Sequence, residues 1–154
     1  MTGPSQSFMD LALEEARVAA QAGEVPIGCV LVCDGEVIAQ SGNRTLAERD
    51  PTAHAEMVAI RRAAEALGSE RLLECDLYVT LEPCAMCAGA IMHARVRRLV
   101  FGARDPKTGA CGSVVDLFAD ARLNHHTRVS GEFLASECGA LLSAFFAARR
   151  ADVP

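Results

Sequence analysis

A regular spacing of apolar side chains between residues 7 and 22 predicts the first helix of the chain. With about 3.6 residues per turn, the apolar positions in this stretch fall on one helix face and the charged and amide positions fall on another. The apolar positions are Phe8, Leu11, Ala12, Ala16 and Ala19. We therefore expect an amphipathic helix that packs on a core through this face.

A hairpin and a second helix are expected next. Residues 27–33 and 36–40 are rich in apolar and β-branched side chains and flank Asp34-Gly35, a pair typical of a two-residue hairpin turn. A helix is then predicted from Asp50-Pro51, because an N-cap residue followed by proline is a common helix start. It would run to Leu67 and end at Gly68.

The second half of the chain continues to alternate between helices and strands. Residues 76–81 are typical of a strand buried on both faces, Pro83 can open a helix that runs to about Ala94, and residues 97–101 form a further strand. A short helix is expected at 114–119 and a long closing helix at 134–150. A hairpin followed by helical crossovers predicts a three-layer α/β fold with a mixed sheet.

The length of 154 residues predicts a single domain spanning residues 1–154. The composition excludes a disordered chain, since 51% of the residues are hydrophobic and 23% are charged. The net charge of −5 argues against a partner held by bulk electrostatics, such as duplex DNA. Basic side chains are nevertheless concentrated in residues 90–110, which hold four arginines and Lys107 against Asp105 alone.

The seven cysteines cannot all be paired within one chain, because their number is odd. The chain does not open on a charged segment followed by an apolar one, so no signal peptide is expected. Its longest apolar run, residues 25–33, is far shorter than the roughly 18 residues that a membrane span needs. We therefore expect a cytoplasmic protein with reduced thiols and no membrane partner.

Two short motifs supply candidate chemistry. His54-Ala55-Glu56 follows a predicted helix start, and Cys84 and Cys87 lie three residues apart at another, so one helical turn puts both sulfurs on one face. A helix N-terminus favours the thiolate form. Two cysteines and one histidine give the ligand count of a catalytic zinc site, which keeps its fourth position for water. A nearby carboxylate such as Glu56 can take the proton of that water and hand it on.

Each motif alone also has a plain interpretation. A C-x-x-C pair near a strand–helix junction fits a redox site, and an H-x-E triplet is typical of a solvated helix turn. A structural zinc or redox module is therefore a second hypothesis. We expect Met86, Ile91 and Met92 to belong to the core, and His125-His126 to lie in a surface loop.

Together, the motifs His54-Ala55-Glu56 and Pro83-Cys84-Ala85-Met86-Cys87 resemble the zinc-dependent nucleobase deaminase superfamily. Residues 50–56, 78–84 and 100–109 are similar to the bacterial branch that deaminates adenosine in transfer RNA, and the likeness covers roughly residues 8–150. The segment F-G-A-R-D-P-K-T-G, residues 101–109, favours this branch. The resemblance implies a three-layer α/β/α cytidine-deaminase-like fold with a mixed central sheet of about five strands.

The resemblance also implies a site and an activity. One Zn²⁺ per subunit would be bound by His54, Cys84 and Cys87, and Glu56 would be the proton shuttle for a zinc-activated water. The reaction would be hydrolytic deamination of adenosine to inosine at the wobble position of a tRNA anticodon stem-loop, by a homodimer. The substrate contacts would come from Asn43, Ala55, Val25, Pro26, Ile27 and Asp105. Of these, Asp105 would lie beside the ribose, whose 2′-hydroxyl distinguishes RNA from DNA.

Two alternatives stay open within this resemblance. A deaminase of the same superfamily could act on a free base or nucleotide, such as guanine, cytosine or deoxycytidylate, because the catalytic motifs are shared. Cys111 departs from the expected pattern and is either an idle buried thiol or a rival metal ligand. The segment A-R-D-P-K-T-G, residues 103–109, favours RNA. The basic residues 90–110 are either a solvated face or the small basic rim that a deaminase needs to take one flipped base, so the net charge does not argue against RNA.

Overall fold

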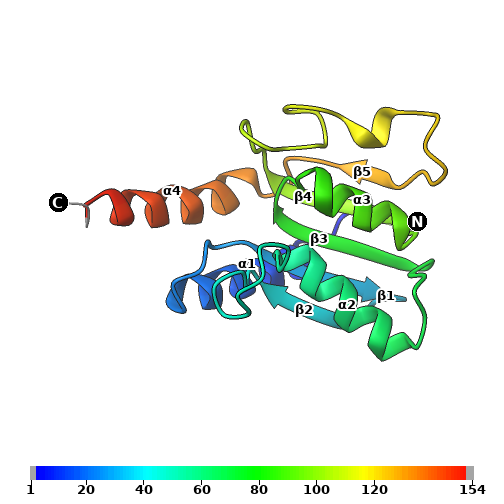
Figure 1. The fold of residues 1–154 in the computed structure, drawn as a ribbon, viewed down its shortest axis with the longest axis horizontal. Coiled ribbons are helices and arrows are strands. Elements are labelled where there is room, and N and C mark those ends of the chain that lie inside the picture. Colours follow the sequence, from blue (N-terminus) through cyan, green and yellow to red (C-terminus); the bar gives the residue numbers. More distant parts are fainter. Residues whose placement is uncertain (1–2, 152–154) are drawn as a thin grey trace.

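A mixed sheet of five strands organises residues 3–151, the part of the chain that the computed structural model describes (Figure 1). The strands are β1 (Gly28–Cys33), β2 (Glu36–Gly42), β3 (Cys75–Leu81), β4 (Arg98–Ala103) and β5 (Arg128–Ser130). Their order is β2-β1-β3-β4-β5. β1 runs antiparallel to both β2 and β3, whereas β3, β4 and β5 are parallel. The ends of the predicted domain, residues 1–2 and 152–154, lie outside the described residues.

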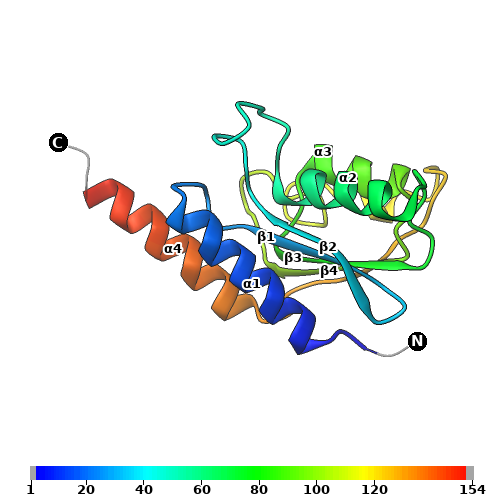
Figure 2. The same ribbon diagram turned by 90° about the horizontal axis from the view of Figure 1, so that it is seen from below.

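Helices cover both faces of this sheet and confirm the predicted three-layer architecture. α1 (Gln6–Gln21) and α4 (Ala135–Ala151) lie side by side on one face, and α2 (Ala55–Leu67) and α3 (Ala85–His93) lie on the other (Figure 2). The sheet therefore has two cores. β3 serves both: Leu77 and Val79 pack on the α2–α3 side, and Tyr78 packs on the α1–α4 side.

The backbone of α1 lies directly against the sheet because two glycines remove the intervening side chains. A Cβ atom on Gly28 would overlap the carbonyl oxygen of Ala12, and one on Gly42 would lie 2.8 Å from the Cβ of Ala19. Of the predicted apolar face, Ala12, Ala16 and Ala19 are buried here, whereas Phe8 is only partly buried and Leu11 is exposed. Met9 and Leu13 are buried instead. This close approach fixes the position of the chain that enters β1 at residues 25–27.

The predicted start of the second helix is wrong. α2 begins at Ala55, with His54 in the extended N-cap position, and not at Asp50-Pro51. The Asp50 carboxylate accepts hydrogen bonds from the backbone N–H and the hydroxyl of Thr52, at 2.8 and 2.7 Å, so this segment forms a turn. The predicted end is confirmed, because Gly68 caps the helix in the left-handed conformation, with φ of 65°.

Two other elements differ from the pattern-based expectation. The short helix predicted at 114–119 is a single 3₁₀ turn, η1 (Leu117–Ala119). β5 was not predicted from the residues, since its side chains are mostly exposed and lack apolar alternation. It joins the sheet through backbone pairing with β4. No helix within residues 3–151 is long and apolar enough to cross a membrane.

Substitution of Gly28 by alanine is expected to destabilise the fold by about 1–3 kcal/mol, because the new methyl group would push α1 away from β1. Gly139→Ala is the matched control. A Cβ at Gly139 meets only an ordinary contact, 3.9 Å from Ala103, and alanine favours a helix over glycine by about 1 kcal/mol. Urea unfolding should give opposite signs for the two variants, and equal stability would contradict the close approach.

Candidate active site

Two helix N-termini meet at the carboxyl end of β3. His54 occupies the N-cap of α2, Cys84 occupies the N-cap of α3, and Cys87 lies in the first turn of α3. Both helices start at the same end of the sheet (Figure 1). The structure therefore brings together the three residues predicted as metal ligands, although 30 residues separate His54 from Cys84.

The distances among these side chains fit a zinc ion. The Nδ1 atom of His54 lies 3.7 Å from the Sγ atom of Cys84 and 3.6 Å from that of Cys87. In a tetrahedral site with Zn–S near 2.3 Å and Zn–N near 2.0 Å, the nitrogen and sulfur atoms are about 3.5 Å apart. Within residues 3–151, these three residues form the one cluster of this kind. A donor set of two sulfurs and one imidazole suits Zn²⁺ and leaves a fourth position open.

Protons are unevenly shared among the three candidate ligands. A hydrogen bond from Cys87 lowers the pKa of the Cys84 thiol to about 4, and the same interaction raises the pKa of Cys87 far above its usual value. The hydrogen bond with Cys84 raises the pKa of His54. Cys84 is therefore a thiolate at neutral pH, and the thiolate is the form that binds metal.

Glu56 is the carboxylate of this site. It lies in the first turn of α2, two residues after His54, and only 4% of its surface is exposed. Burial raises its pKa to about 7. A carboxyl group with such a pKa can both take and give a proton near neutral pH, as general acid–base catalysis requires.

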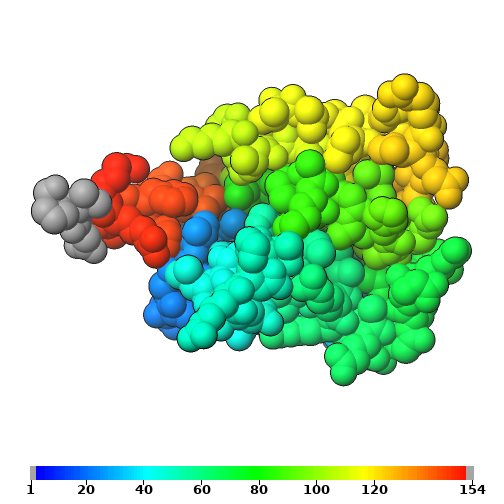
Figure 3. Space-filling view, viewed as in Figure 1, coloured from blue at the N-terminus to red at the C-terminus, as the bar shows by residue number. Residues whose placement is uncertain are grey.

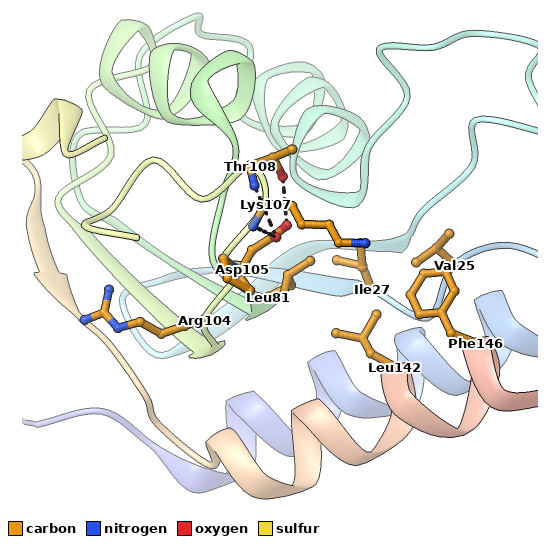
Figure 4. Close-up of a pocket in the computed structure, with 10 residues that line it drawn as sticks. Val25, Ile27, Leu81, Arg104, Asp105, Lys107, Thr108, Leu142 and Phe146 are labelled. Carbon is orange, nitrogen blue, oxygen red and sulfur yellow. Dashed lines mark hydrogen bonds between the residues drawn. The ribbon is translucent and has the colours of Figure 1, made fainter. Parts of the chain in front are cut away.

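A cavity of about 120 Å³ opens beside this cluster. It is lined by two of the three cluster residues together with Glu56, one strand end and one loop: Ile27, His54, Glu56, Leu81, Glu82, Cys84, Asp105 and Thr108. A second cavity of about 420 Å³ shares Ile27, Leu81, Asp105 and Thr108 with the first, so the two adjoin. Figure 4 shows the larger one between the loop 104–108, residues 25–27 and the side chains of Leu142 and Phe146 from α4.

The predicted substrate residues are only partly gathered here. Val25 lines the larger cavity, and Asp105 lines both cavities. Ala55, which lies between His54 and Glu56 in the sequence, is fully buried. The neighbouring Pro26 is also buried.

Asn43 lies apart from this group. It lines a separate hollow of about 100 Å³, and its amide donates to the Thr45 hydroxyl at 3.4 Å. Its backbone N–H bonds to the Ile27 carbonyl at 3.0 Å, which keeps it next to the cavity wall.

Asp105 has a local role in its own loop. Its Oδ1 atom accepts the backbone N–H groups of Lys107 and Thr108 at 3.0 and 3.2 Å, and its Oδ2 atom accepts the Thr108 hydroxyl at 2.8 Å (Figure 4). A carboxylate has about four acceptor positions, so one position remains free on Oδ2. The free acceptor position therefore belongs to Asp105, a side chain that lines both cavities.

Sequence reasoning missed Glu82, although it directly precedes Pro83-Cys84. Its side chain is fully buried and accepts hydrogen bonds from the loop that contains Asp105. Burial alone would raise its pKa, but the bonds from the Ser113 hydroxyl and from backbone N–H groups outweigh that effect and hold the pKa below its usual value. The available signal was a charged residue at the end of a fully buried strand. Leu142 and Phe146 were missed as well, because they belong to a helix distant in sequence.

Other expectations about individual residues gave mixed results. Cys111 is buried and does not belong to the metal cluster of the described residues, which supports its interpretation as an idle thiol. Ile91 is in the core as predicted, but Met86 is 36% exposed, so its predicted place in the core is wrong. His125 is half-buried in a loop, and its Nε2 atom lies 2.9 Å from the Val96 carbonyl oxygen.

The family of the chain follows from its similarity to known proteins. Residues 3–103 match the model of the cytidine and deoxycytidylate deaminase zinc-binding region. The chain therefore belongs to the zinc-binding cytidine and deoxycytidylate deaminase family. The metal-binding geometry of His54, Cys84 and Cys87 agrees with this assignment.

Relatives narrow the comparison within the family. The chain is 56% identical to the tRNA-specific adenosine deaminase of Agrobacterium fabrum, over 94% of this chain and 95% of that protein. A solved structure from work on A-to-I editing by tRNA deaminases at the wobble position is also 56% identical, with a TM-score of 0.87 over 90% of this chain and 100% of that one. Guanine deaminase from Bacillus subtilis is 34% identical, with a TM-score of 0.65 over 96% and 95% of the two chains. The predicted resemblance to the tRNA branch is confirmed.

Replacement of Cys87 by serine is expected to reduce the zinc content from about one ion per chain to nearly none, because two protein ligands hold the ion far less tightly than three. Zinc is to be measured by mass spectrometry of the purified protein. Cys111→Ser is the matched control and should retain its zinc, since that thiol lies outside the cluster. Loss of zinc from the Cys111 variant would place this thiol among the ligands.

Proposed function

We propose that the chain is a zinc-dependent hydrolase that converts adenosine to inosine at the wobble position of a tRNA anticodon. The observation that carries the proposal is that one cavity is lined by His54, Cys84 and the buried carboxylate Glu56, and that Cys87 completes a cluster of possible metal ligands with His54 and Cys84. The 56% identity to a tRNA-specific adenosine deaminase over nearly the whole chain supports the choice of substrate. A structural zinc or redox module would leave Glu56 without a role.

The chain's own residues would handle the protons of the reaction. Zinc held by His54, Cys84 and Cys87 would supply a water that is nucleophilic at neutral pH. Glu56 would accept one proton of the attacking water and pass it to the adenine ring nitrogen next to the amino group. It would then take the proton of the hydroxyl now bound to C6 and deliver it to the departing amine, which leaves as ammonia. One water enters and one ammonia leaves, so adenosine becomes inosine. Burial of Glu56 keeps bulk water away from this transfer.

The larger cavity has the chemistry to hold a nucleotide of a single-stranded loop. Val25, Leu142 and Phe146 give it an apolar wall on which a base can stack, and Lys107 adds positive charge for phosphate (Figure 4). The free acceptor position of Asp105 would face the ribose 2′-hydroxyl.

The other predicted contacts keep their proposed roles. Pro26 would shape the wall and the Ala55 backbone would hold the edge of the ring. The Asn43 amide would have to turn from Thr45 toward the cavity to bind the base.

We also propose that residues 1–154 form one deaminase domain, with a core of about 8–150, that acts as a homodimer in the cytoplasm. All seven cysteines are free, which suits a reducing compartment. α3 contains no Asp, Glu, Lys or Arg, yet few of its side chains are buried, and it lies exposed between α2 and the loop that follows β4 (Figure 3). Beside it is a groove of about 480 Å³ that includes Met92, Leu117 and Leu123. A second copy of the chain would cover this apolar face.

Glu56→Gln is expected to keep its zinc and to lower kcat by about 10²–10⁴-fold, because the amide can neither take nor deliver the proton. Inosine formation is to be measured on an anticodon stem-loop with adenosine at the wobble position. Free adenosine, guanine and cytidine serve as parallel substrates. Normal turnover by the variant, or wild-type activity on a free base alone, would refute the proposed function.

Asp105→Asn is expected to narrow the preference for RNA over DNA stem-loops by about three- to tenfold. The amide oxygen can still accept the backbone N–H groups of Lys107 and Thr108. An NH₂ group replaces the oxygen that accepts the Thr108 hydroxyl and that has the free acceptor position; it can donate to the Thr108 hydroxyl but cannot accept from a ribose. The ratio of kcat/KM for the two stem-loops is the measurement. Asp116→Asn is the control, since this exposed carboxylate caps a turn in the same way outside both cavities. Equal effects in both variants would count against the ribose contact.

Met86→Glu is expected to shift the sedimentation mass from two chains to one, because a charge would be buried at the proposed interface. Leu73→Glu is the control, since Leu73 is 56% exposed and lies before β3, at the opposite end of that strand from the metal cluster. A wild-type mass of one chain would contradict the homodimer.

A further inference from the structure

Glu82 binds a loop that is distant from it in sequence. Its Oε1 atom accepts the backbone N–H of Asp105 at 3.0 Å and the hydroxyl of Ser113. Its Oε2 atom accepts the backbone N–H groups of Cys111 and Ser113 at 2.9 and 3.1 Å. All four donors belong to residues 105–113, which we call the cavity loop.

These bonds leave Glu82 no capacity to act on a substrate. A carboxylate offers about four acceptor positions, and four donors fill them. The side chain is fully buried, and the Arg104 guanidinium lies 4.0 Å away, where it balances the negative charge. A carboxylate with every position filled by its own chain holds structure in place and does not transfer protons.

The cavity loop is also attached to the segment that carries the metal ligands. The backbone N–H of Ala110 donates to the Pro83 carbonyl at 2.8 Å, and Gly109 forms a β-bridge with Cys84. A Cβ atom at Gly109 would overlap the Glu82 carboxyl carbon. The loop therefore lies as close to Glu82-Pro83-Cys84 as the backbone allows, and a shift of Glu82 would move loop and metal site apart.

We propose that Glu82 is a positioning residue that fixes the cavity loop, and with it Asp105 and Thr108, at a set distance from the metal cluster. Asp105 and Thr108 line both the small and the large cavity, so the loop sets how a nucleotide enters the site. The inference rests on the proposed function for its substrate, the RNA stem-loop. The placement of the loop itself is independent of that substrate.

Glu82→Gln tests this placement. Glutamine keeps one carbonyl oxygen but turns an NH₂ group toward two of the donors, so the loop should loosen. Hydrogen exchange at the amides of Asp105, Cys111 and Ser113 should accelerate, and zinc content should stay near one. The KM for the stem-loop should rise about tenfold, with a smaller fall in kcat.

Asp76→Asn is the matched control. Asp76 is a buried carboxylate at the other end of β3, and its Oδ2 atom lies 3.0 Å from the Arg98 guanidinium. Removing its charge tests whether general destabilisation of the fold is enough to change the cavity loop. This variant should change neither loop exchange nor KM. Ser113→Ala is the milder companion for the case that Glu82→Gln does not fold. It removes one donor and should change loop exchange and KM in the same direction, by less.

The outcomes separate the two proposals. Unchanged exchange in the cavity loop of Glu82→Gln, or an equal change in Asp76→Asn, overturns the positioning role. Faster exchange with an unchanged KM overturns its link to substrate entry. Failure of the wild-type protein to deaminate the stem-loop refutes the proposed function, whereas the exchange measurement still decides whether Glu82 holds the loop.

Discussion

The burial of β3 on both faces is the constraint on which the rest of the structure depends. A strand without a solvent face needs helices above and below it, and α1 and α4 pack on one side while α2 and α3 pack on the other. Its carboxyl end then lies where two helices begin. Leu81 is the last residue of the strand, and Glu82 and Cys84 follow shortly after it. One strand therefore positions a residue of the cavity wall, the carboxylate that holds the cavity loop, and a candidate metal ligand.

Two buried carboxylates near that strand end show how their surroundings determine what each can do. Glu56 lies in a pocket where burial raises its pKa to about 7. Glu82 is buried as well, but hydrogen bonds from the cavity loop hold its pKa below the usual value. The first can therefore exchange a proton near neutral pH, and the second stays charged and fixed. Such separation of pKa values is how one site assigns different roles to identical groups.

The sequence predicted those features that local patterns encode. Apolar spacing located α1, β1, β3 and α4, and the two short motifs located the metal cluster. It could not predict the true start of α2, because the Asp50 carboxylate favours a turn with Thr52 over a helix cap. It also missed β5, which depends on pairing with β4, and Glu82, whose partners are 23 to 31 residues away. Long-range backbone hydrogen bonds leave no periodic trace in the residues that make them.

The separation between His54 and the two cysteines also affects how the site is assembled. Cys84 and Cys87 are neighbours in any conformation of the chain, so they can hold a metal ion loosely before the fold exists. His54 reaches them only after α2 and α3 have both docked on the sheet. As the third ligand, His54 would therefore couple tight metal binding to completed folding, and the energy of that last bond would add to the stability of the native state. In a newly made chain, tight binding of the metal ion by all three residues would indicate that folding is complete.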